Sequence, residues 1–264
     1  MEPGNRSNAR KIAIEIQYDG TCFNGWQLQK DSRTVQGELE RALQILCRDK
    51  TRVTAAGRTD AGVHALGQII HFGTNSDIRL QKLCISLNGI LPRDISVKNA
   101  YRVSDDFHAR FDAIERTYRY LIYNHPSRTP FMMFRAMWVR ERLDIDYLRA
   151  VSGLLLGERD FSSFCKKSES RKINTVRRVT AIDIQRRDNC ICFEITGNAF
   201  LHHMVRILVG TLVEMHKNKA DPHMISDIIS KRDRDYGGVT APPYGLYLLN
   251  VKYDPSLSTL ESAF

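Results

Sequence analysis

The sequence lacks the features that mark a metal centre, a nucleotide-binding loop or a membrane span. Its six cysteines form no C-x-x-C pair and no spacing typical of metal ligands. Neither G-x-x-x-x-G-K-[ST] nor G-x-G-x-x-G occurs. No apolar run approaches the ~18 residues that a membrane helix needs, and the start does not resemble a signal peptide. We therefore expect a protein of a reducing, cytoplasmic compartment that does not enter a membrane.

Acidic residues are fewer than basic ones, 30 against 39, which gives a net charge of +9 and a pI near 9.3. This excess favours a polyanionic partner, although a soluble protein without such a partner can carry the same charge. Hydrophobic residues at 42% and charged residues at 26% are ordinary globular values and predict a packed core. The length of 264 residues allows one large domain or two small ones.

Hydrophobic periodicity predicts the same order of elements twice, β-α-β-β-α-β in each half of the chain. Strands are expected at 12–18, 52–56, 67–72, 95–103, 117–123, 179–185, 191–196 and 246–253, and helices at 35–46, 80–87, 145–155, 204–216 and 221–230. Thr34 is the expected N-cap of the first helix, and Cys190 and Cys192 would share a core-facing side of their strand. The sequence thus predicts an α/β (α+β) fold of two ferredoxin-like halves, 1–104 and 105–264, whose mainly antiparallel sheets form a central cleft.

The densest polar cluster is Gly57-Arg58-Thr59-Asp60-Ala61-Gly62, in the expected turn between two strands. Its ordinary interpretation is a surface turn in which Arg58 and Asp60 pair, and spacing alone favours that interpretation. The catalytic interpretation is that the glycines let the Asp60 carboxylate approach a substrate closely, while the guanidinium keeps it ionised. An ionised aspartate suits a nucleophile better than a general acid.

Arginine and tyrosine alternate in a second candidate segment, which contains Arg110, Arg116, Tyr118 and Arg119. These side chains could simply pack across strands, with the arginine stems lying along apolar surface. In the functional interpretation, the arginines contact phosphates beside an aromatic ring that stacks on a base. The first interpretation is favoured unless other features point to RNA.

Two histidines and an arginine lie where the helix expected at 204–216 begins. His202 and His203 would project about 100° apart if both were helical, so they would not readily share a metal. No H-x-x-x-H spacing supports zinc either. Arg206 falls in the first turn, where the helix dipole favours acidic residues, and this indicates a specific anionic partner such as a carboxylate.

Basic residues crowd the polar stretch 166–178. Such a run is usually a solvated loop, but beside a net charge of +9 a phosphate-binding loop is equally consistent with it. Its members are Lys166, Lys167, Arg171, Lys172, Arg177 and Arg178.

Taken together, these stretches resemble the tRNA pseudouridine synthase A family. The matching motifs occur in order across nearly the whole chain, so the resemblance is specific, and it favours the functional interpretation of each motif. They are Y-D-G-T-x-F-N-G-W-Q at 18–27, V-Q-G-E-L-E-R-A-L at 35–43, A-G-R-T-D-A-G-V-H-A at 56–65, F-H-A-R-F at 107–111, R-T-Y-R-Y at 116–120, D-F-S-S-F at 160–164, F-L-H-H-M-V-R at 200–206 and G-L-Y-L-x-x-V-x-Y at 245–253. One departure is Leu28, where the family more often has an arginine that would contact RNA.

The resemblance implies an enzyme that isomerises uridine to pseudouridine at positions 38, 39 and 40 in the anticodon stem-loop of tRNA. It also implies a homodimer that needs no cofactor, and the residue spacing predicts no metal site. By position, Asp60 matches the essential aspartate, and Arg58 matches an arginine that helps to bring the base into the site. Tyr118 matches a tyrosine that packs on the target base, and Arg206 matches a basic residue that pairs with the aspartate. Arg110 is assigned to substrate binding as a phosphate contact.

In this reaction the glycosidic C–N bond breaks, the base turns, and C5 bonds to C1′, without redox change or energy input. Asp60 could attack C1′, abstract the C2′ proton or add to C6, and Tyr118 could be a base or a stacking platform. One rival function is a non-catalytic RNA-binding protein with two RRM-like sheets, which predicts RNP-type aromatic motifs that the sequence lacks. Another is an RNA hydrolase or N-glycosylase that uses Asp60, which predicts cleaved RNA or free uracil.

Overall fold

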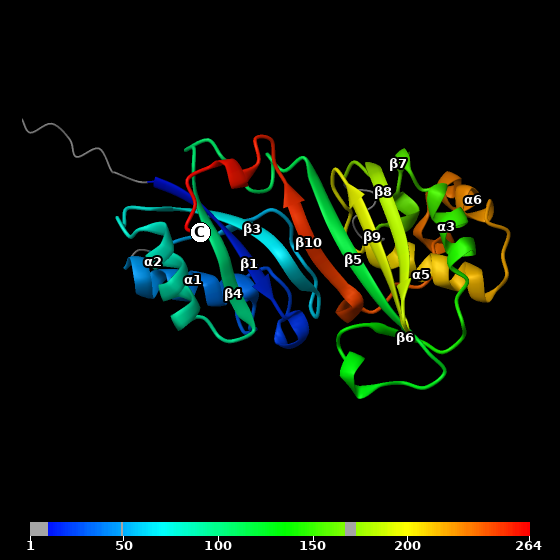
Figure 1. Ribbon diagram of the computed structural model, residues 1–264. Coiled ribbons are helices and arrows are strands. Elements are labelled where there is room, and N and C mark those ends of the chain that lie inside the picture. Colours follow the sequence, from blue (N-terminus) through cyan, green and yellow to red (C-terminus); the bar gives the residue numbers. More distant parts are fainter. Residues whose placement is uncertain (1–9, 49, 167–172) are drawn as a thin grey trace, which may run out of the picture. The chain divides into compact units, whose positions relative to one another are not determined.

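The computed structural model describes residues 10–48, 50–166 and 173–264, which pack as two compact units (Figure 1). Unit 1 contains residues 10–114 and 251–264, and unit 2 contains residues 115–250. The segments 105–114 and 251–264 therefore pack with unit 1, although the expected boundary at 104–105 assigns both to the second half.

Unit 1 has the order β-α-β-β-α-β. Its elements are β1 (Arg10–Tyr18), α1 (Val35–Cys47), β2 (Thr54–Ala55), β3 (His64–Thr74), α2 (Leu80–Ile90) and β4 (Ile95–Val103). The strands lie in the order β4-β1-β3-β2, and each neighbouring pair is antiparallel. Thr34 caps α1 as expected, because its side chain accepts a hydrogen bond from the backbone N–H of Gly37.

The helices of unit 1 lie side by side along one face of its sheet (Figure 1). Segments 104–114 and 251–260 cover part of the other face, where they form a second hydrophobic cluster. The cluster contains Ala13, Ala56, Ile69, Tyr101, Val103, Phe107, Ala109, Ala113, Tyr253 and Leu257. This apolar cover explains why the C-terminal segment returns to unit 1.

Unit 2 repeats the arrangement with additional short elements. Its elements are β5 (Glu115–Asn124), β6 (Met137–Val139), α3 (Ile145–Gly153), β7 (Gly157–Asp160), β8 (Val176–Arg187), β9 (Cys190–Gly197), α5 (Met204–Lys217), α6 (Met224–Lys231) and β10 (Leu246–Lys252). The strand order is β10-β5-β9-β8-β7, with β6 parallel to β5. Strands β10, β5, β9 and β8 thus correspond to β4, β1, β3 and β2 of unit 1. The expected α+β fold, with mainly antiparallel sheets and a repeated ferredoxin-like order, is confirmed.

One expectation about the core is wrong. Cys190 and Cys192 are only half-buried, because they lie on the face of β9 opposite the fully buried Ile191, Phe193 and Ile195. The period of two assigns the bulkier apolar residues to the core and turns the cysteines away from it.

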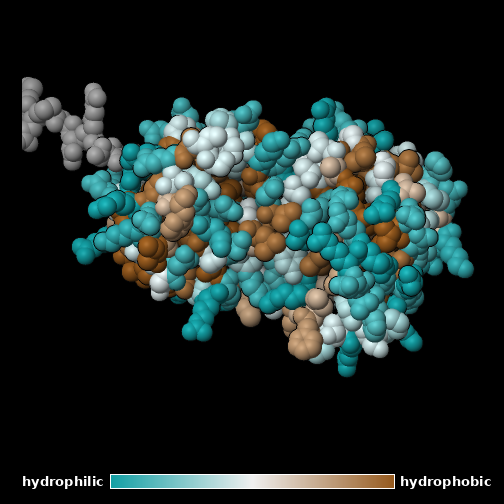
Figure 2. All heavy atoms as spheres, in the orientation of Figure 1, coloured by the Kyte–Doolittle hydropathy of each residue, from teal (hydrophilic) through white to brown (hydrophobic). Residues whose placement is uncertain are grey.

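Hydrophilic residues cover much of the face in Figure 2, and hydrophobic atoms reach the surface in separate patches. Among the described residues no helix is both long and apolar enough to cross a bilayer.

Candidate active site

Asp60 lies in the turn that connects β2 to β3 in unit 1. Its backbone carbonyl accepts a hydrogen bond from the Val63 N–H at 3.2 Å, and Gly62 has a φ of +79°, which a residue without a side chain adopts most readily. Thr59 is buried, Asp60 is half-buried and Arg58 is exposed. The turn therefore holds its backbone inside the unit while the Asp60 carboxylate can reach solvent.

Two buried side chains fix the start of this turn. Gln68, in the middle of β3, donates from Nε2 to the Gly57 carbonyl at 2.7 Å, and its Oε1 accepts from the Gly57 N–H at 3.4 Å. The hydroxyls of Tyr18 and Thr59 lie 2.7 Å apart, also buried. Because the side chains of Gln68, Tyr18 and Thr59 are all buried, breaking one of these bonds would leave a buried side-chain polar group unsatisfied.

The loop after η1 (Gly20–Cys22) packs directly on the backbone of the turn. The Trp26 N–H donates to the Thr59 carbonyl at 3.0 Å, and the Gly62 N–H donates to the Phe23 carbonyl at 3.3 Å. Gly25 has a φ of +86°, and a Cβ there would lie 2.9 Å from the Thr59 carbonyl oxygen. Only a glycine allows the loop to approach so closely, so the N-G-W-Q and R-T-D-A-G motifs form one structure.

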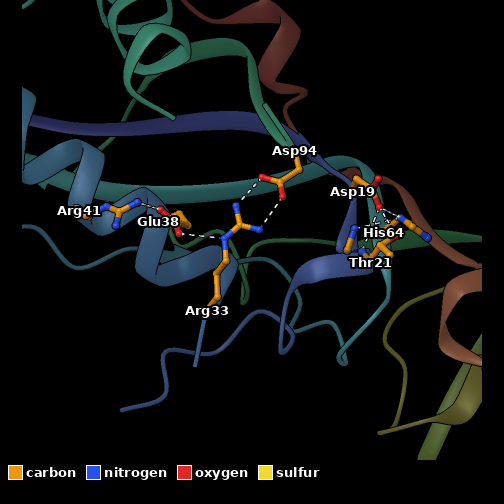
Figure 3. Close-up of polar contacts among 8 residues, drawn as sticks. Asp19, Thr21, Arg33, Glu38, Arg41, His64 and Asp94 are labelled. Carbon is orange, nitrogen blue, oxygen red and sulfur yellow. Dashed lines mark hydrogen bonds and ion pairs between the residues drawn. The ribbon is translucent and has the colours of Figure 1, made fainter. Parts of the chain in front are cut away.

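An ion pair anchors the far end of the same loop (Figure 3). Arg33 makes a bidentate contact with Asp94, at 2.7 Å from Nη1 to Oδ2 and 2.8 Å from Nη2 to Oδ1. It also lies 3.3 Å from Glu38 and 4.2 Å from the centre of the Phe23 ring. The hydrogen bond to Asp94 raises the pKa of the Arg33 guanidinium. The Arg33 carbonyl accepts from the Asn24 N–H at 2.8 Å, so the ion pair between Arg33 and Asp94 also holds the part of the loop near Asn24 in place.

His64, the first residue of β3, supports the turn from its other end (Figure 3). Its Nδ1 lies 3.1 Å from the Gly20 N–H and 3.1 Å from Asp19 Oδ1. Nδ1 accepts the hydrogen bond from the Gly20 N–H. Asp19 also accepts from the N–H and the hydroxyl of Thr21, at 3.1 and 2.6 Å.

Arg58 does not form the surface pair with Asp60 that the ordinary interpretation of the motif requires. Its side chain is exposed, and it has no hydrogen-bond or ion-pair partner among residues 10–48, 50–166 and 173–264. An unpaired guanidinium two residues from the carboxylate is well suited to an anionic substrate.

In unit 2, β5 carries Arg116, Tyr118 and Arg119 of the second candidate segment, whereas Arg110 lies in unit 1. Tyr118 contacts the ring of Phe200 edge-on, with centroids 5.1 Å apart. Arg116 is buried and donates to the Asn198 carbonyl at 2.8 Å. Arg119 pairs across the strands with Glu194, at 2.6 Å from Nη2. For Arg116 and Arg119 the packing interpretation is thus supported, and the expected phosphate contact of Arg119 would compete with Glu194.

Arg206 lies in the first turn of α5, as expected. Its Nε donates to the Ala241 carbonyl at 2.8 Å, and its own carbonyl accepts from the Ala241 N–H at 3.1 Å. The segment before Ala241 lies so close to α5 that a Cβ on Gly210 would meet the Val239 carbonyl oxygen at 1.9 Å. These contacts orient the Arg206 guanidinium from the backbone of a neighbouring segment.

His202 and His203 do not lie within the helix, contrary to the expectation. The helix α5 begins at Met204, and His203 is its N-cap with a φ of +66°. Since His202 precedes the helix, the 100° separation of helical neighbours does not apply. The rings lie 4.2 Å apart. The absence of a metal site therefore stays a prediction.

The basic run 166–178 is only partly described, because Lys167, Arg171 and Lys172 lie outside the described residues. Arg177 donates to the Asn174 carbonyl at 2.9 Å, and burial lowers the pKa of its guanidinium. Arg178 lies 3.5 Å from Glu158. These two arginines therefore have structural partners within unit 2.

Comparison with known proteins identifies the family of this chain. The family model described as tRNA pseudouridine synthase matches residues 14–112 and 151–254, which include the Asp60 turn and the loop packed on it. The tRNA pseudouridine synthase A of Burkholderia cenocepacia is 44% identical over 243 residues, 92% of this chain and 90% of that protein. The protein of the same name from Paraburkholderia phytofirmans is 43% identical over 244 residues, also 92% and 90%.

A third relative, from Buchnera aphidicola, is 39% identical over 257 residues, 97% of this chain and 96% of that protein, and is also named tRNA pseudouridine synthase A. Among solved structures, the archaeal box H/ACA sRNP Nop10-Cbf5 complex aligns with a TM-score of 0.34 and 11% identity, over 76% of this chain and 42% of that chain; a likeness this weak carries no argument. The family model and the relatives cover the Asp60 turn, both units and most of the chain, and the chain therefore belongs to the tRNA pseudouridine synthase family.

Proposed function

We propose that this synthase isomerises uridine to pseudouridine at positions 38, 39 and 40 of the tRNA anticodon stem-loop, with Asp60 as its catalytic residue. The observation that carries the assignment of Asp60 is the construction of its turn. Gln68, Thr59 and the loop at Gly25 hold the backbone, while the carboxylate itself remains accessible. A rigidly held carboxylate suits a reaction in which a base must turn within the site.

The reaction balances within one nucleotide. The bond from C1′ to N1 breaks, the bond from C1′ to C5 forms, and the proton on C5 is lost while N1 gains one. No oxidant, reductant or energy source enters this balance, so we propose that the enzyme needs no cofactor. Asp60 acts by attack on C1′, by abstraction of the C2′ proton or by addition to C6, and each route requires the ionised carboxylate.

We assign the substrate contacts to Arg58, Tyr118, Arg206 and Arg110. Arg58 is exposed and has no hydrogen-bond or ion-pair partner in the described part of the chain, which supports a contact with the RNA backbone or the displaced base. Tyr118 belongs to a small aromatic cluster with Phe200, which supports stacking on the uracil ring. The fixed guanidinium of Arg206 supports a role as the partner of the Asp60 carboxylate. These roles remain predictions. It also remains a prediction that the first half carries the catalytic turn and the second half completes the active site.

The test measures turnover and product together. The protein and the Asp60→Asn variant are given tRNA labelled with tritium at C5 of uridine, and the release of tritium is followed. Wild type should release it, whereas Asp60→Asn should release none and should bind tRNA within roughly tenfold of wild type, because phosphate contacts dominate affinity. Asp77→Asn, which changes an exposed carboxylate in a loop of the same unit, is the matched control.

Three further results would contradict the proposal. Release by Asp60→Asn at the native rate would remove Asp60 from the mechanism. Shortened RNA or free uracil would indicate a hydrolase or N-glycosylase. A pseudouridine-specific chemical label that maps outside positions 38–40, in tRNA from cells with and without the gene, would contradict the assigned positions.

We also propose that the enzyme works in the cytoplasm as a homodimer. The segment 128–138 supports the dimer, because its side chains Phe131, Met133, Phe134 and Trp138 are exposed. It contains no Lys, Asp or Glu, and aromatic residues, Met and Arg are typical of interface cores. Light scattering should give twice the chain mass for wild type and for Phe264→Glu, and the single mass for Phe131→Glu. A single mass for wild type would contradict the dimer.

A further inference from the structure

Phe111 is an apolar side chain held out in solvent by a well-ordered turn of unit 1. Its exposed fraction is 74%, although Ala109 and Ala113, two residues away on each side, are buried. Single exposed aromatic rings are common on protein surfaces, but Phe111 differs from the others in its setting, because it ends the F-H-A-R-F motif and lies beside Arg110.

The turn that presents Phe111 is fixed through Ala109. The Ala109 N–H donates to Nδ1 of His71 at 3.1 Å, and its carbonyl accepts from the Tyr253 hydroxyl at 2.6 Å. Phe107 is buried against Tyr253, with ring centroids 5.3 Å apart, and its carbonyl accepts from Lys11 at 3.0 Å. Both backbone polar groups of Ala109 are thus bonded to side chains from distant parts of the chain, and the turn is organised before any ligand arrives.

Three aromatic rings form a ladder that leads from the interior to the surface. His71, which is buried, contacts His108 edge-on with centroids 4.9 Å apart. His108 in turn stacks on Phe111 with centroids 4.3 Å apart and an angle of 26° between the planes. One face of the Phe111 ring is therefore covered by His108, and the exposed fraction belongs chiefly to the other face. The guanidinium of Arg110 lies 5.7 Å from the centre of the same ring.

We propose that the open face of Phe111 stacks on an unpaired base of the bound tRNA, beside a phosphate that Arg110 contacts. An aromatic face next to a cation is the combination by which proteins hold single-stranded RNA, since every base offers a π-face and every nucleotide a phosphate. The aromatic ladder makes Phe111 rigid, so little side-chain entropy is lost when a base stacks on it. This inference rests on the proposed RNA substrate, but not on the role of Asp60.

The first test compares tRNA affinity among variants of exposed phenylalanines. Phe111→Ala should raise Kd by about 5- to 150-fold, as expected for the loss of one stacked base worth about 1–3 kcal/mol. Phe111→Trp should bind as wild type does, because stacking survives. Phe264→Ala, which removes another exposed ring of unit 1, should have no effect. The single-turnover rate at saturating enzyme should change little in all three variants, since the stacking contributes to binding.

The second test reports stacking directly. Phe111→Trp places an indole at the site, and its fluorescence should be quenched when tRNA binds, by comparison with wild type and with Phe264→Trp. Native affinity in Phe111→Ala, or an unquenched indole in Phe111→Trp, would overturn the inference. Neither result would affect the proposed function, which tritium release by wild type tests independently.

Discussion

Gln68 bonds both backbone polar groups of Gly57, through Nε2 to the carbonyl at 2.7 Å and through Oε1 to the N–H at 3.4 Å. Gly57 lies two residues after the end of β2, where the chain enters the turn that carries Asp60. A side chain of the neighbouring strand therefore replaces the hydrogen bonds that the sheet would otherwise provide. The position of the Asp60 turn depends on this amide, which is eleven residues from Gly57 in sequence.

Gln68→Leu should destabilise the protein and slow catalysis. Leucine has a similar size but leaves the polar groups of Gly57 without their partner, at a cost of about 1–3 kcal/mol. We expect a lower midpoint of urea unfolding and a lower kcat, with KM for tRNA nearly unchanged, because no RNA contact is removed. The control is Gln44→Leu, on the exposed side of α1, which should behave as wild type does. An unchanged kcat in Gln68→Leu would show that the turn does not need this anchor.

Arg33→Lys should impair catalysis without impairing RNA binding. Lysine keeps the charge but cannot make the planar, bidentate contact with Asp94, so the loop that packs on the Asp60 turn loses its anchor. We expect a several-fold fall in kcat and a similar fall in Asp94→Asn. Arg41→Lys is the control, because Arg41 contacts Glu38 but not Asp94.

A double-mutant cycle tests whether Arg33 and Asp94 affect catalysis as a pair or independently. Since the two side chains act as a pair, the combined Arg33→Lys and Asp94→Asn variant should be little worse than either single variant. Fully additive losses in kcat would contradict a shared role.

The sequence could predict elements and motifs whose signal is local. The helix after Thr34 follows from its apolar spacing and its cap, and the R-T-D-A-G turn follows from its glycines. Gln68 carries a weak signal in the sequence, because a polar residue inside an apolar strand often has a buried partner. That partner could not be inferred without the strand pairing.

Other features depend on contacts between distant segments. Arg33 follows a polar stretch and is separated from Asp94 by 61 residues, so a solvated side chain was the natural expectation. The pairing of Arg119 with Glu194 depends on the register between β5 and β9, which a single sequence does not specify. The apolar cover on the second face of the unit 1 sheet could not be predicted either, because it depends on the return of the segment after Val251 to unit 1.

Acid should destabilise the protein through His71. Burial, with smaller effects of His108 and Lys11 opposed by Asp112, lowers the pKa of His71 to about 4 from an ordinary value near 6.5. Between these values the unfolded chain binds the proton and the folded chain does not, so stability falls as pH falls from about 6.5 to 4. Above about pH 6.5 His71 makes no pH-dependent contribution.

His71→Asn isolates this effect, because the asparagine oxygen can still accept the Ala109 N–H. The difference in unfolding free energy between pH 7 and pH 4 should be smaller in the variant by on the order of 2–3 kcal/mol. Urea unfolding at both pH values measures it. Equal pH dependence in the two proteins would mean that His71 is protonated as readily in the folded as in the unfolded chain.

Tyr118→Phe distinguishes the two roles that remain open for this residue. The ring and its edge contact with Phe200 survive the substitution, so a pure stacking residue should keep its activity. If the hydroxyl takes the C5 proton, kcat should fall by about 10²–10⁴-fold with little change in KM, because general base catalysis typically contributes that much. We expect the second outcome. Tyr123→Phe removes a hydroxyl from the same strand on its opposite face and should leave tritium release unchanged. Near-native release by Tyr118→Phe would assign Tyr118 to stacking alone, and another group would have to accept the proton.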